Sequence, residues 1–427
     1  MSFRAVEIMN DHIIIIGASH AGVSFAEAMR SNGFAGHLTM IERLAGMPME
    51  RPPLSKAFLL NDNDSNGDGG GDAKFYLRKS DWFAAKDIVL RDGVSVTNIN
   101  AADHTIDLDD GTQLPYDKLV LATGAVPHML AAAKGLANVH VVRDPSDAAG
   151  LRSSIATAKS AIVIGGGYIG LETAASLRKT GLTVAVIEAA DRLLARVASP
   201  AISEFFADLH TANGVTLHIG AGAASIDSID GVFCGVTLDD GTKLTADMLI
   251  VGIGVAPDMN LANMANLDCG NGILVGADMQ TSDAAIYAIG DAALCAATAP
   301  QVAGTPIRVE SVHNAQDSAA RAAAAINGHA APAWQAPWFW SEQYDARLQS
   351  AGIVPPAGED VVSVLRPGKR EDGLSCWSFA NGALHAIEAV RDPKSYMLGK
   401  KCLDVGKSPT PEQAADPEFD IKAFLAD

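Results

Sequence analysis

Two glycine-rich turns, each followed by a carboxylate further along the chain, carry the clearest chemistry in this sequence. Residues 11–22, DHIIIIGASHAG, and residues 160–170, SAIVIGGGYIG, each read as an apolar strand, a tight turn and the start of a helix. Roughly 20 residues after each turn, a second apolar strand ends in Glu42 or Glu188. Such a turn aims the free N–H groups of a helix at a pyrophosphate, and the carboxylate accepts hydrogen bonds from ribose hydroxyls. The pattern predicts two dinucleotide sites, although either turn alone could be an ordinary glycine-rich connection.

The first turn departs from the usual pattern at its middle position. Ser19 replaces the middle glycine of Gly17-x-Ser19-x-x-Gly22, and its side chain narrows the approach of a pyrophosphate to the backbone. The Ser19 hydroxyl could instead donate a hydrogen bond to a phosphate oxygen. His20 follows directly, and we interpret it as a helix-start residue near the phosphates rather than as a catalytic base.

The elements that position these turns occur twice in the chain. Residues 109–127 read DDGTQLPYDKLVLATGAVP, and residues 239–257 read DDGTKLTADMLIVGIGVAP. Each copy therefore runs from strand, turn and helix to a hairpin-like DDGT segment and a buried strand that ends in Gly-x-x-Pro. This duplication predicts an α/β protein with two Rossmann-like dinucleotide-binding domains.

Composition narrows the class of protein further. The chain has 427 residues, of which 48% are hydrophobic and 19% charged, and its net charge of −18 argues against nucleic acid as a partner. No apolar run approaches the roughly 18 residues of a membrane span, and the first residues lack the features of a signal peptide. We therefore expect a cytoplasmic enzyme that does not bind membranes. The cysteines are widely spaced without a CxxC pair, which argues against a metal site or a disulfide framework: Cys234, Cys269, Cys295, Cys376 and Cys402.

Seven segments carry a family resemblance: GASHAG, ERPPLSK, LATGA, GGGYIGLE, AIGD, RVESVHNA and PWFWSEQYD. Together they resemble the FAD-dependent ferredoxin reductases of oxygenase and cytochrome P450 systems, the putidaredoxin reductase-like group, along nearly the whole chain. Residues 281–291, TSDAAIYAIGD, are similar to the second FAD fingerprint of these two-dinucleotide flavoproteins, in which Asp291 would bind the ribityl chain. The helix expected over 312–327 would point its N-terminus at the flavin and stabilise its reduced, negatively charged form. The resemblance thus assigns FAD to the first turn and NAD(P) to the second.

The resemblance also implies a domain organisation and a set of cofactor-binding residues. It implies a glutathione reductase-like fold with a discontinuous FAD domain (1–122 and 249–332), an inserted NAD domain (123–248) and a C-terminal α/β domain (333–427). The residues that it implies in binding FAD or NADH are Gly17, Ser19, His20, Ala21, Gly22, Glu42, Arg43, Arg51, Pro52, Lys56, Ala122, Thr123, Gly124, Gly165, Gly167, Tyr168, Ile169, Gly170, Glu188, Gly254, Gly290, Asp291, Ser311, Val312 and Trp340.

The segment MERPPLSK, residues 49–56, distinguishes this chain from the disulfide reductases of similar fold. Those enzymes carry a CxxxxC pair beside the isoalloxazine, whereas here two prolines stiffen the backbone and no cysteine is present. The resemblance implies that Arg51 and Pro52 line the FAD site and that Lys56 reaches flavin N5. A buried lysine needs a counter-charge, which we expect from Glu172. The alternative is a plain salt bridge between domains.

Two aromatic residues complete the catalytic region that the resemblance implies. Tyr168 matches the aromatic that covers the flavin until nicotinamide displaces it, and we count it with Lys56 and Glu172 as catalytic. Trp340 matches a flavin-contacting tryptophan, with Trp338 as the fallback. Both aromatics could instead be ordinary core residues.

The function that follows is electron transfer from NADH through FAD to a [2Fe-2S] ferredoxin that serves an oxygenase or a cytochrome P450. The flavin performs the chemistry, so no general acid or base is required. Two alternatives stay open: an NADH oxidase, quinone or rubredoxin reductase on the same scaffold, or a redox-responsive binding protein like apoptosis-inducing factor. We expect a monomer or a weak homodimer.

Charges suggest which nicotinamide and which acceptor surface the chain uses. Glu188 would repel the 2′-phosphate of NADPH, so we expect a preference for NADH, which Arg192 and Arg196 could soften. Residues 338–407 hold as many basic as acidic residues, unlike the acidic remainder, and an acidic ferredoxin would approach them with less repulsion. The basic residues expected to border that docking surface are Arg308, Arg391, Lys394, Lys400 and Lys401.

One segment stands apart from the family pattern. Residues 61–72, NDNDSNGDGGGD, open like an EF-hand loop, but Ala73 occupies the position that requires a bidentate glutamate. We therefore expect a mobile loop rather than a calcium site. Met9 is an alternative start to Met1.

Overall fold

The computed structural model describes residues 11–61, 72–296, 306–356, 358–368, 370 and 372–426. Met1, Met9 and most of the polar segment 61–72 lie outside the described residues. The chain divides into a first unit of Met1–Glu50, Phe75–Val126 and Ala256–Trp334, and a second unit of Arg51–Lys74, Pro127–Val255 and Gln335–Asp427. No helix in the described ranges has the length and apolar content to cross a membrane.

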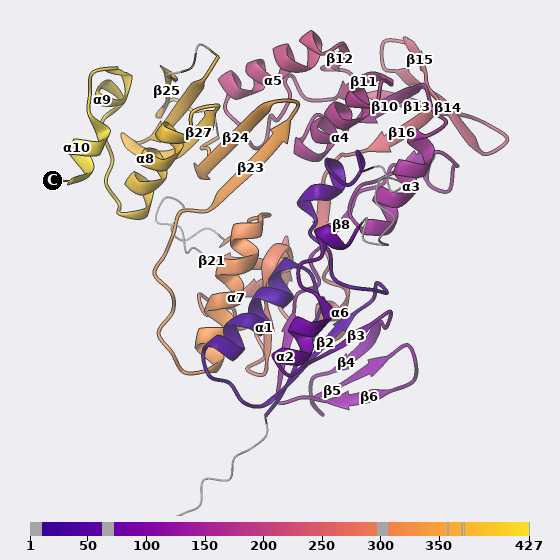
Figure 1. Ribbon diagram of the computed structural model, residues 1–427, viewed down its shortest axis with the longest axis vertical. Helices are drawn as coiled ribbons and strands as arrows, with labels where there is room; N and C mark the ends of the chain where they lie inside the picture. Colours follow the sequence, from indigo (N-terminus) through magenta and orange to yellow (C-terminus); the bar gives the residue numbers. More distant parts are fainter. Residues whose placement is uncertain are drawn as a thin grey trace, which may run out of the picture. The chain divides into compact units, whose positions relative to one another are not determined.

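The first unit is built on a parallel five-stranded sheet in the order β20-β7-β1-β2-β3, of which β2 and β3 are labelled in Figure 1. Its strands are β1 (His12–Ile16), β2 (His37–Glu42), β3 (Ile88–Asp92), β7 (Lys118–Leu121) and β20 (Ile286–Ala288). A parallel sheet is covered on both faces, so its strands read as continuous apolar runs, and three consecutive isoleucines of β1 are fully buried. Helices α1 (His20–Ser31) and α7 (Val312–Ile326) pack side by side.

Smaller elements complete the first unit. A three-stranded antiparallel sheet contains β4 (Val96–Asn100), β5 (Thr105–Leu108) and β6 (Gln113–Pro115). A four-stranded sheet contains β18 (Cys269–Gly270), β19 (Gly272–Val275), β21 (Ala293–Ala296) and β22 (Pro306–Ile307). The short helices are α2 (Ser80–Ala85) and α6 (Asn260–Met264). The chain segments at the boundary of the two units are β8 (Ala125–Pro127) and β17 (Val255–Pro257), which form a two-stranded sheet.

The second unit repeats the parallel sheet, in the order β12-β11-β10-β16-β9. Its strands are β9 (Val139–His140), β10 (Ser160–Ile164), β11 (Thr183–Glu188), β12 (Val215–Ile219) and β16 (Met248–Val251). The strand that precedes each glycine turn lies centrally in both sheets, and the DDGT segments form antiparallel hairpins in both copies. The predicted internal repeat is therefore confirmed. The other elements of this module are α3 (Pro145–Ile155), α4 (Tyr168–Lys179), α5 (Pro200–Ala212), β13 (Ala223–Ile229), β14 (Val232–Leu238) and β15 (Lys243–Thr245).

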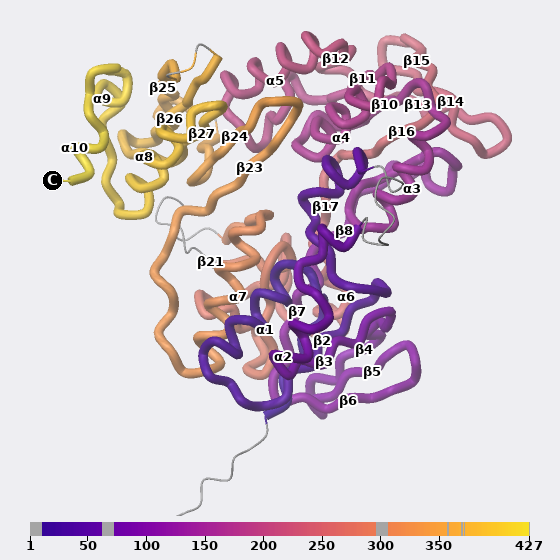
Figure 2. The backbone as a smooth tube through the Cα atoms, viewed as in Figure 1, coloured from indigo at the N-terminus to yellow at the C-terminus, as the bar shows by residue number. Residues whose placement is uncertain are grey.

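The second unit also contains an antiparallel five-stranded sheet in the order β23-β24-β27-β26-β25 (Figure 2). Its strands are β23 (Trp338–Gln343), β24 (Ala346–Gly352), β25 (Val361–Pro367), β26 (Leu374–Ala380) and β27 (Ala383–Val390). Helix α8 (Pro393–Asp404) packs on β24 and β27 and is followed by α9 (Pro411–Ala415) and α10 (Ile421–Ala426). The MERPPLSK segment forms a short 3₁₀ helix, η1 (Pro52–Ser55).

Candidate functional site

The two glycine turns have nearly the same geometry. Gly17 and Gly165 adopt φ values of +105° and +108°, which side-chain-bearing residues rarely reach. A Cβ on Gly17 would lie 2.3 Å from the carbonyl oxygen of Ala122, and a Cβ on Gly165 would lie 2.3 Å from that of Gly252. Only glycine therefore lets each turn pack against the neighbouring strand, which leaves the helix N-terminus beside the carboxyl end of the sheet where dinucleotides bind.

The carboxylates Glu42 and Glu188 hold the turns that precede them. Glu42 Oε2 accepts a hydrogen bond from the backbone N–H of Ala18 at 2.8 Å, and Glu188 Oε2 accepts one from Gly166 at 2.6 Å. The second oxygen of each carboxylate accepts from the N–H two positions on, at 3.0 and 2.8 Å. Each oxygen has a further lone pair for a ribose hydroxyl. Sequence reasoning missed this second role, in which the acid fixes the turn.

The N-termini of α1 and α4 match the needs of a pyrophosphate. Ser19 and Gly167 are the N-cap residues, and neither helix has a side-chain cap or an acidic residue in its first turn. Among the described residues, nothing lies within 4 Å of a Cβ built on Gly167. First-turn N–H groups without a capping side chain form an anion-binding position. The residues present thus fit a dinucleotide at both turns. His20 begins α1, as predicted.

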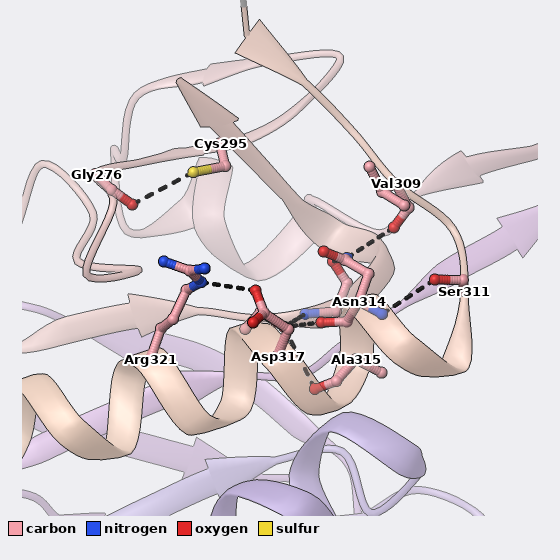
Figure 3. A network of polar contacts seen from close by, with 10 residues as sticks. Gly276, Cys295, Val309, Ser311, Asn314, Ala315, Asp317 and Arg321 are labelled. Carbon is pink, nitrogen blue, oxygen red and sulfur yellow. Dashed lines mark hydrogen bonds and ion pairs between the residues drawn. The ribbon is translucent and has the colours of Figure 1, made fainter. Parts of the chain in front are cut away.

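Helix α7 holds the Gly290-Asp291 segment that follows β20, and Figure 3 shows Ser311 at the start of this helix. Ser311 caps α7, because its Oγ accepts from the N–H of Asn314 at 3.0 Å. Ser318 Oγ accepts from the N–H of Gly290 at 3.0 Å and donates to the carbonyl of Asn314 at 2.6 Å. The Gly290-Asp291 segment is therefore tied to the first two turns of α7. Ser318 was not singled out from the sequence.

A small cavity with a mixed polar and apolar lining lies beside this network. It measures about 30 Å³ and borders β21, β22 and α7, with Cys295, Asp317 and Arg321 among its lining residues. Arg321 is only 6% exposed and pairs with Asp317 at 2.6 Å. The cavity can hold a water molecule but no nucleotide, so we assign it no part in cofactor binding. Within the described ranges, no group of three or more potential ligand side chains could hold a metal ion.

Lys56 and Glu172 form the predicted ion pair within the second unit. Lys56 Nζ lies 2.5 Å from Glu172 Oε2, and their side chains are 18% and 3% exposed. Ser55 Oγ donates to the same oxygen at 2.6 Å, and Ser341 Oγ donates to Oε1 at 2.7 Å. Glu172 is therefore a fully partnered buried carboxylate. Neither serine was singled out from the sequence, because only tertiary packing brings their hydroxyl groups to Glu172.

Arg51 begins the segment that leads to Lys56. Its guanidinium pairs with Asp144, the N-cap residue of α3, and Pro52 occupies the first position of η1. Ser176 Oγ on α4 donates to the carbonyl of Ser55 at 2.7 Å. Both ends of η1 are thus attached to helices of the second unit.

An aromatic cluster adjoins the N-terminus of α4. The ring of Tyr168 lies 4.5 Å from that of Phe339, and Trp340 lies 5.7 Å from Trp338 and 6.5 Å from Phe339, measured between ring centroids. Desolvation, followed by the charges of Glu388 and Glu172, raises the pKa of the Tyr168 hydroxyl. Phe339 was missed, although it stands between the two tryptophans in the sequence.

Glu388 is a second buried carboxylate that sequence reasoning missed. It is fully buried on β27, and both of its carboxylate oxygens accept from the N–H of Ser199, the N-cap residue of α5, at 3.1 Å. Desolvation raises its pKa to about 7, against the opposing effects of the hydrogen bonds from Ser199 and the charge of Arg192. A single acidic residue in the apolar run ALHAIEAV was the available signal.

The basic residues expected at an acceptor surface differ in their surroundings. Arg391 and Lys400 in the second unit and Arg308 in the first are each engaged in ion pairs, and their side chains are at most 18% exposed. Lys394 and Lys401 are exposed on α8. The most accessible of these charges therefore lie on α8.

Two congruent dinucleotide modules, a flavin-type fingerprint and a buried lysine–carboxylate pair define a two-dinucleotide-binding oxidoreductase. The profile described as "Pyridine nucleotide-disulphide oxidoreductase" matches residues 11–319, and the one described as "Reductase C-terminal" matches residues 338–425. The chain belongs to the pyridine nucleotide-disulphide oxidoreductase family. It is an NAD(P)H-dependent oxidoreductase that uses FAD.

Known proteins resemble the chain along its whole length. Rhodocoxin reductase of Rhodococcus erythropolis is 40% identical over 97% of this chain and 94% of its own. Ferredoxin--NAD(P)(+) reductase of a Sphingomonas species is 35% identical over 97% of each chain. The crystal structure of the ferredoxin reductase for the CYP199A2 system from Rhodopseudomonas palustris superposes with a TM-score of 0.90 at 37% identity, covering 97% of this chain and 100% of that one. The predicted family and fold class are confirmed.

Proposed function

We propose that this chain is a ferredoxin reductase that passes electrons from NADH through FAD to a [2Fe-2S] ferredoxin serving an oxygenase or a cytochrome P450. The observation that carries the proposal is the full-length similarity, C-terminal domain included, to reductases whose names specify ferredoxin as the acceptor. The MERPPLSK segment supports it, because no cysteine there can accept electrons in place of an external partner.

We assign the two cofactors to the two modules. FAD would bind the turn at Gly17 with Glu42 and the Gly290-Asp291 segment, and NADH would bind the turn at Gly165 with Glu188. The FAD domain would comprise residues 1–122 and 249–332, the NAD domain 123–248 and the C-terminal domain 333–427. Bound FAD supplies the conversion between two-electron and one-electron chemistry. The protein supplies the binding and orientation of the cofactors and an exit for the electrons.

We assign catalytic roles to three residues near the start of α4. Lys56, fixed by Glu172, would present a single positive charge to the flavin N5 edge. Tyr168 would cover the flavin ring until nicotinamide arrives, with Trp340 as a second aromatic contact. No proton needs to leave any of these groups for hydride to pass.

The surroundings of Glu188 favour NADH over NADPH. A carboxylate at this position repels a 2′-phosphate, whereas the nearby Arg192 cannot readily turn toward one. Its guanidinium donates to the carbonyl groups of Ala195 and Ala198 at 2.9 Å and to Ser203 Oγ at 2.6 Å. Of these two arginines, Arg196 is the exposed one and could still bind the phosphate.

The acceptor test separates the proposed function from its alternatives. FAD-loaded protein is reduced anaerobically with NADH and mixed with [2Fe-2S] ferredoxins, rubredoxin, quinone or oxygen. We expect the fastest reoxidation with a ferredoxin. Faster transfer to rubredoxin, quinone or oxygen would identify the alternative enzyme, and slow reoxidation by every acceptor would favour a redox-responsive binding protein.

A matched pair of glycine substitutions tests the FAD assignment. Gly17→Ala would drive a Cβ into a carbonyl oxygen at 2.3 Å, whereas Gly33 has a similar positive φ of +88° with nothing within 4 Å among the described residues. We expect purified protein to be yellow with one non-covalent FAD, Gly33→Ala to keep it, and Gly17→Ala to lose most of it. Equal FAD content in both variants would refute the assignment. We also propose that the protein is a monomer or a weak homodimer and that it acts in the cytoplasm.

A further inference from the structure

A series of hydrogen-bonded, buried side chains extends from Glu172 through the second unit. Ser341 Oγ lies 2.7 Å from Glu172 Oε1, and Gln343 Nε2 lies 3.1 Å from Ser341 Oγ. His210 Nε2 lies 2.7 Å from Gln343 Oε1, and the Tyr344 hydroxyl lies 3.4 Å from His210 Nδ1. Glu172, Ser341, Gln343 and His210 are each no more than 2% exposed. These residues come from α4, β23 and α5, so the chain joins three elements of the unit.

The chemistry of each group gives the chain one direction. The Glu172 carboxylate can only accept, so Ser341 donates to it and accepts from the amide nitrogen of Gln343. The amide oxygen of Gln343 then accepts from His210, which must carry its proton on Nε2. The remaining ring nitrogen accepts from Tyr344. Burial lowers the pKa of the His210 imidazole, in agreement with this neutral tautomer.

The same groups exclude a proton wire. An amide cannot accept a proton on its oxygen and pass another from its nitrogen without changing tautomer, so Gln343 interrupts transfer between His210 and Ser341. These hydrogen bonds can hold groups in place but cannot conduct protons. The series of hydrogen bonds ends at Oε1 of Glu172, whereas Lys56 and Ser55 both contact Oε2 of the same carboxylate. Ser341 alone among the described side chains donates to Oε1, and the terminal torsion of a glutamate is otherwise broad.

We propose that His210, Gln343 and Ser341 form a positioning chain that fixes the Glu172 carboxylate and, through it, the Lys56 ammonium. This inference rests on the proposed function, in which Lys56 faces the flavin. With Oε1 released, the carboxylate turns about its terminal torsion and the ammonium bonded to Oε2 moves with it. Misplacement by about 1 Å can cost roughly a hundredfold in rate.

Two serines provide a matched test. Ser341 and Ser375 are both fully buried on the antiparallel sheet, and each accepts one side-chain hydrogen bond, from Gln343 at 3.1 Å and from Trp377 at 3.2 Å. Of the two, Ser341 is the one bonded to Glu172. We expect Ser341→Ala to slow flavin reduction by NADH at least about fivefold with unchanged NADH affinity, and Ser375→Ala to reduce at the wild-type rate. Equal rates in the two variants would overturn the proposal.

A spectroscopic measurement tests the chain independently of turnover. In protein labelled with ¹⁵N-histidine, His210, assigned by the loss of its signals in His210→Asn, should show the neutral Nε2–H tautomer at pH 7. Gln343→Leu should abolish this tautomer preference, while Ser375→Ala should leave it intact. An Nδ1–H tautomer or an imidazolium in the wild type would contradict the chain. A wild-type protein that NADH does not reduce would instead refute the proposed function and leave the tautomer result valid.

Discussion

Replacing Lys56 by methionine removes the positive partner of a buried carboxylate and keeps a side chain of similar length. The Glu172 side chain is 3% exposed and would retain only the hydroxyl donors Ser55 and Ser341. Breaking a buried ion pair from one side costs about 3–5 kcal/mol. Because both hydroxyls stay in place and the Lys56 side chain is 18% exposed, we expect the lower end, about 3 kcal/mol.

The double variant Lys56→Met/Glu172→Gln isolates the cause of that loss. A neutral amide at 172 leaves no charge to compensate, so the double variant should be more stable than Lys56→Met alone by about 1–3 kcal/mol. The assay is denaturant unfolding of the FAD-loaded proteins, read transition by transition because more than one unit can unfold separately. Anaerobic stopped-flow mixing with NADH measures flavin reduction in the same samples.

We expect Lys56→Met to bind FAD normally and to be reduced by NADH more slowly than the wild type. Two results would refute the reasoning at different steps. Equal stability of the single and double variants would show that no uncompensated charge is left at Glu172. If flavin reduction keeps its wild-type rate while stability falls as expected, the Lys56–Glu172 pair is only a structural salt bridge.

Three further predictions follow from charges in the structure. Glu188 should give NADH at least about a tenfold advantage over NADPH in kcat/KM, or ~1.4 kcal/mol, and steady-state rates with Glu188→Ala should show a smaller ratio. Lys394→Glu combined with Lys401→Glu should raise KM for ferredoxin and leave hydride transfer from NADH unchanged; turnover indifferent to both mutation and ionic strength would place the dock elsewhere. Burial raises the pKa of Glu388 from 4.5 to about 7, so the folded protein holds this proton more tightly than the unfolded chain, and stability falls as pH rises through that window. Glu388→Gln should therefore gain up to about 3 kcal/mol relative to the wild type at pH 8 but not at pH 4, as measured by denaturant unfolding at both pH values.

The glycine turns and their acidic residues were predictable because their geometry is local. Gly17 and Gly165 each follow an apolar strand and precede a helix, and a tight turn between these elements needs a positive φ. The carboxylates at 42 and 188 end the next strand, which a parallel sheet places beside the first. Chain order and strand pairing therefore bring these groups together without information from distant segments.

The surroundings of Glu172 could not be predicted in the same way. Ser341, Gln343 and His210 are ordinary polar residues in the sequence, and only tertiary packing places them in one chain. A weaker signal did exist, because Ser341 and Gln343 stand two positions apart in a strand and therefore share one face, which the structure shows to be buried. Polar residues on the buried face of a strand require hydrogen-bond partners. The same argument applies to Glu388 in its apolar run.

The stiffness of MERPPLSK acquires a specific purpose in this arrangement. Consecutive residues of an extended strand point in opposite directions, yet Ser55 and Lys56 both reach the same carboxylate oxygen. The 3₁₀ turn that begins at Pro52 makes this convergence possible. The proline rings restrict the backbone already in the unfolded chain, so less conformational entropy is lost when the turn forms. The turn is attached to α4 through Ser176 and Glu172, which holds the lysine, while the hydrogen bonds that run from His210 to Ser341 hold the other carboxylate oxygen of Glu172. A segment that lacks redox chemistry of its own can thus hold one charge at a constant position through many turnovers.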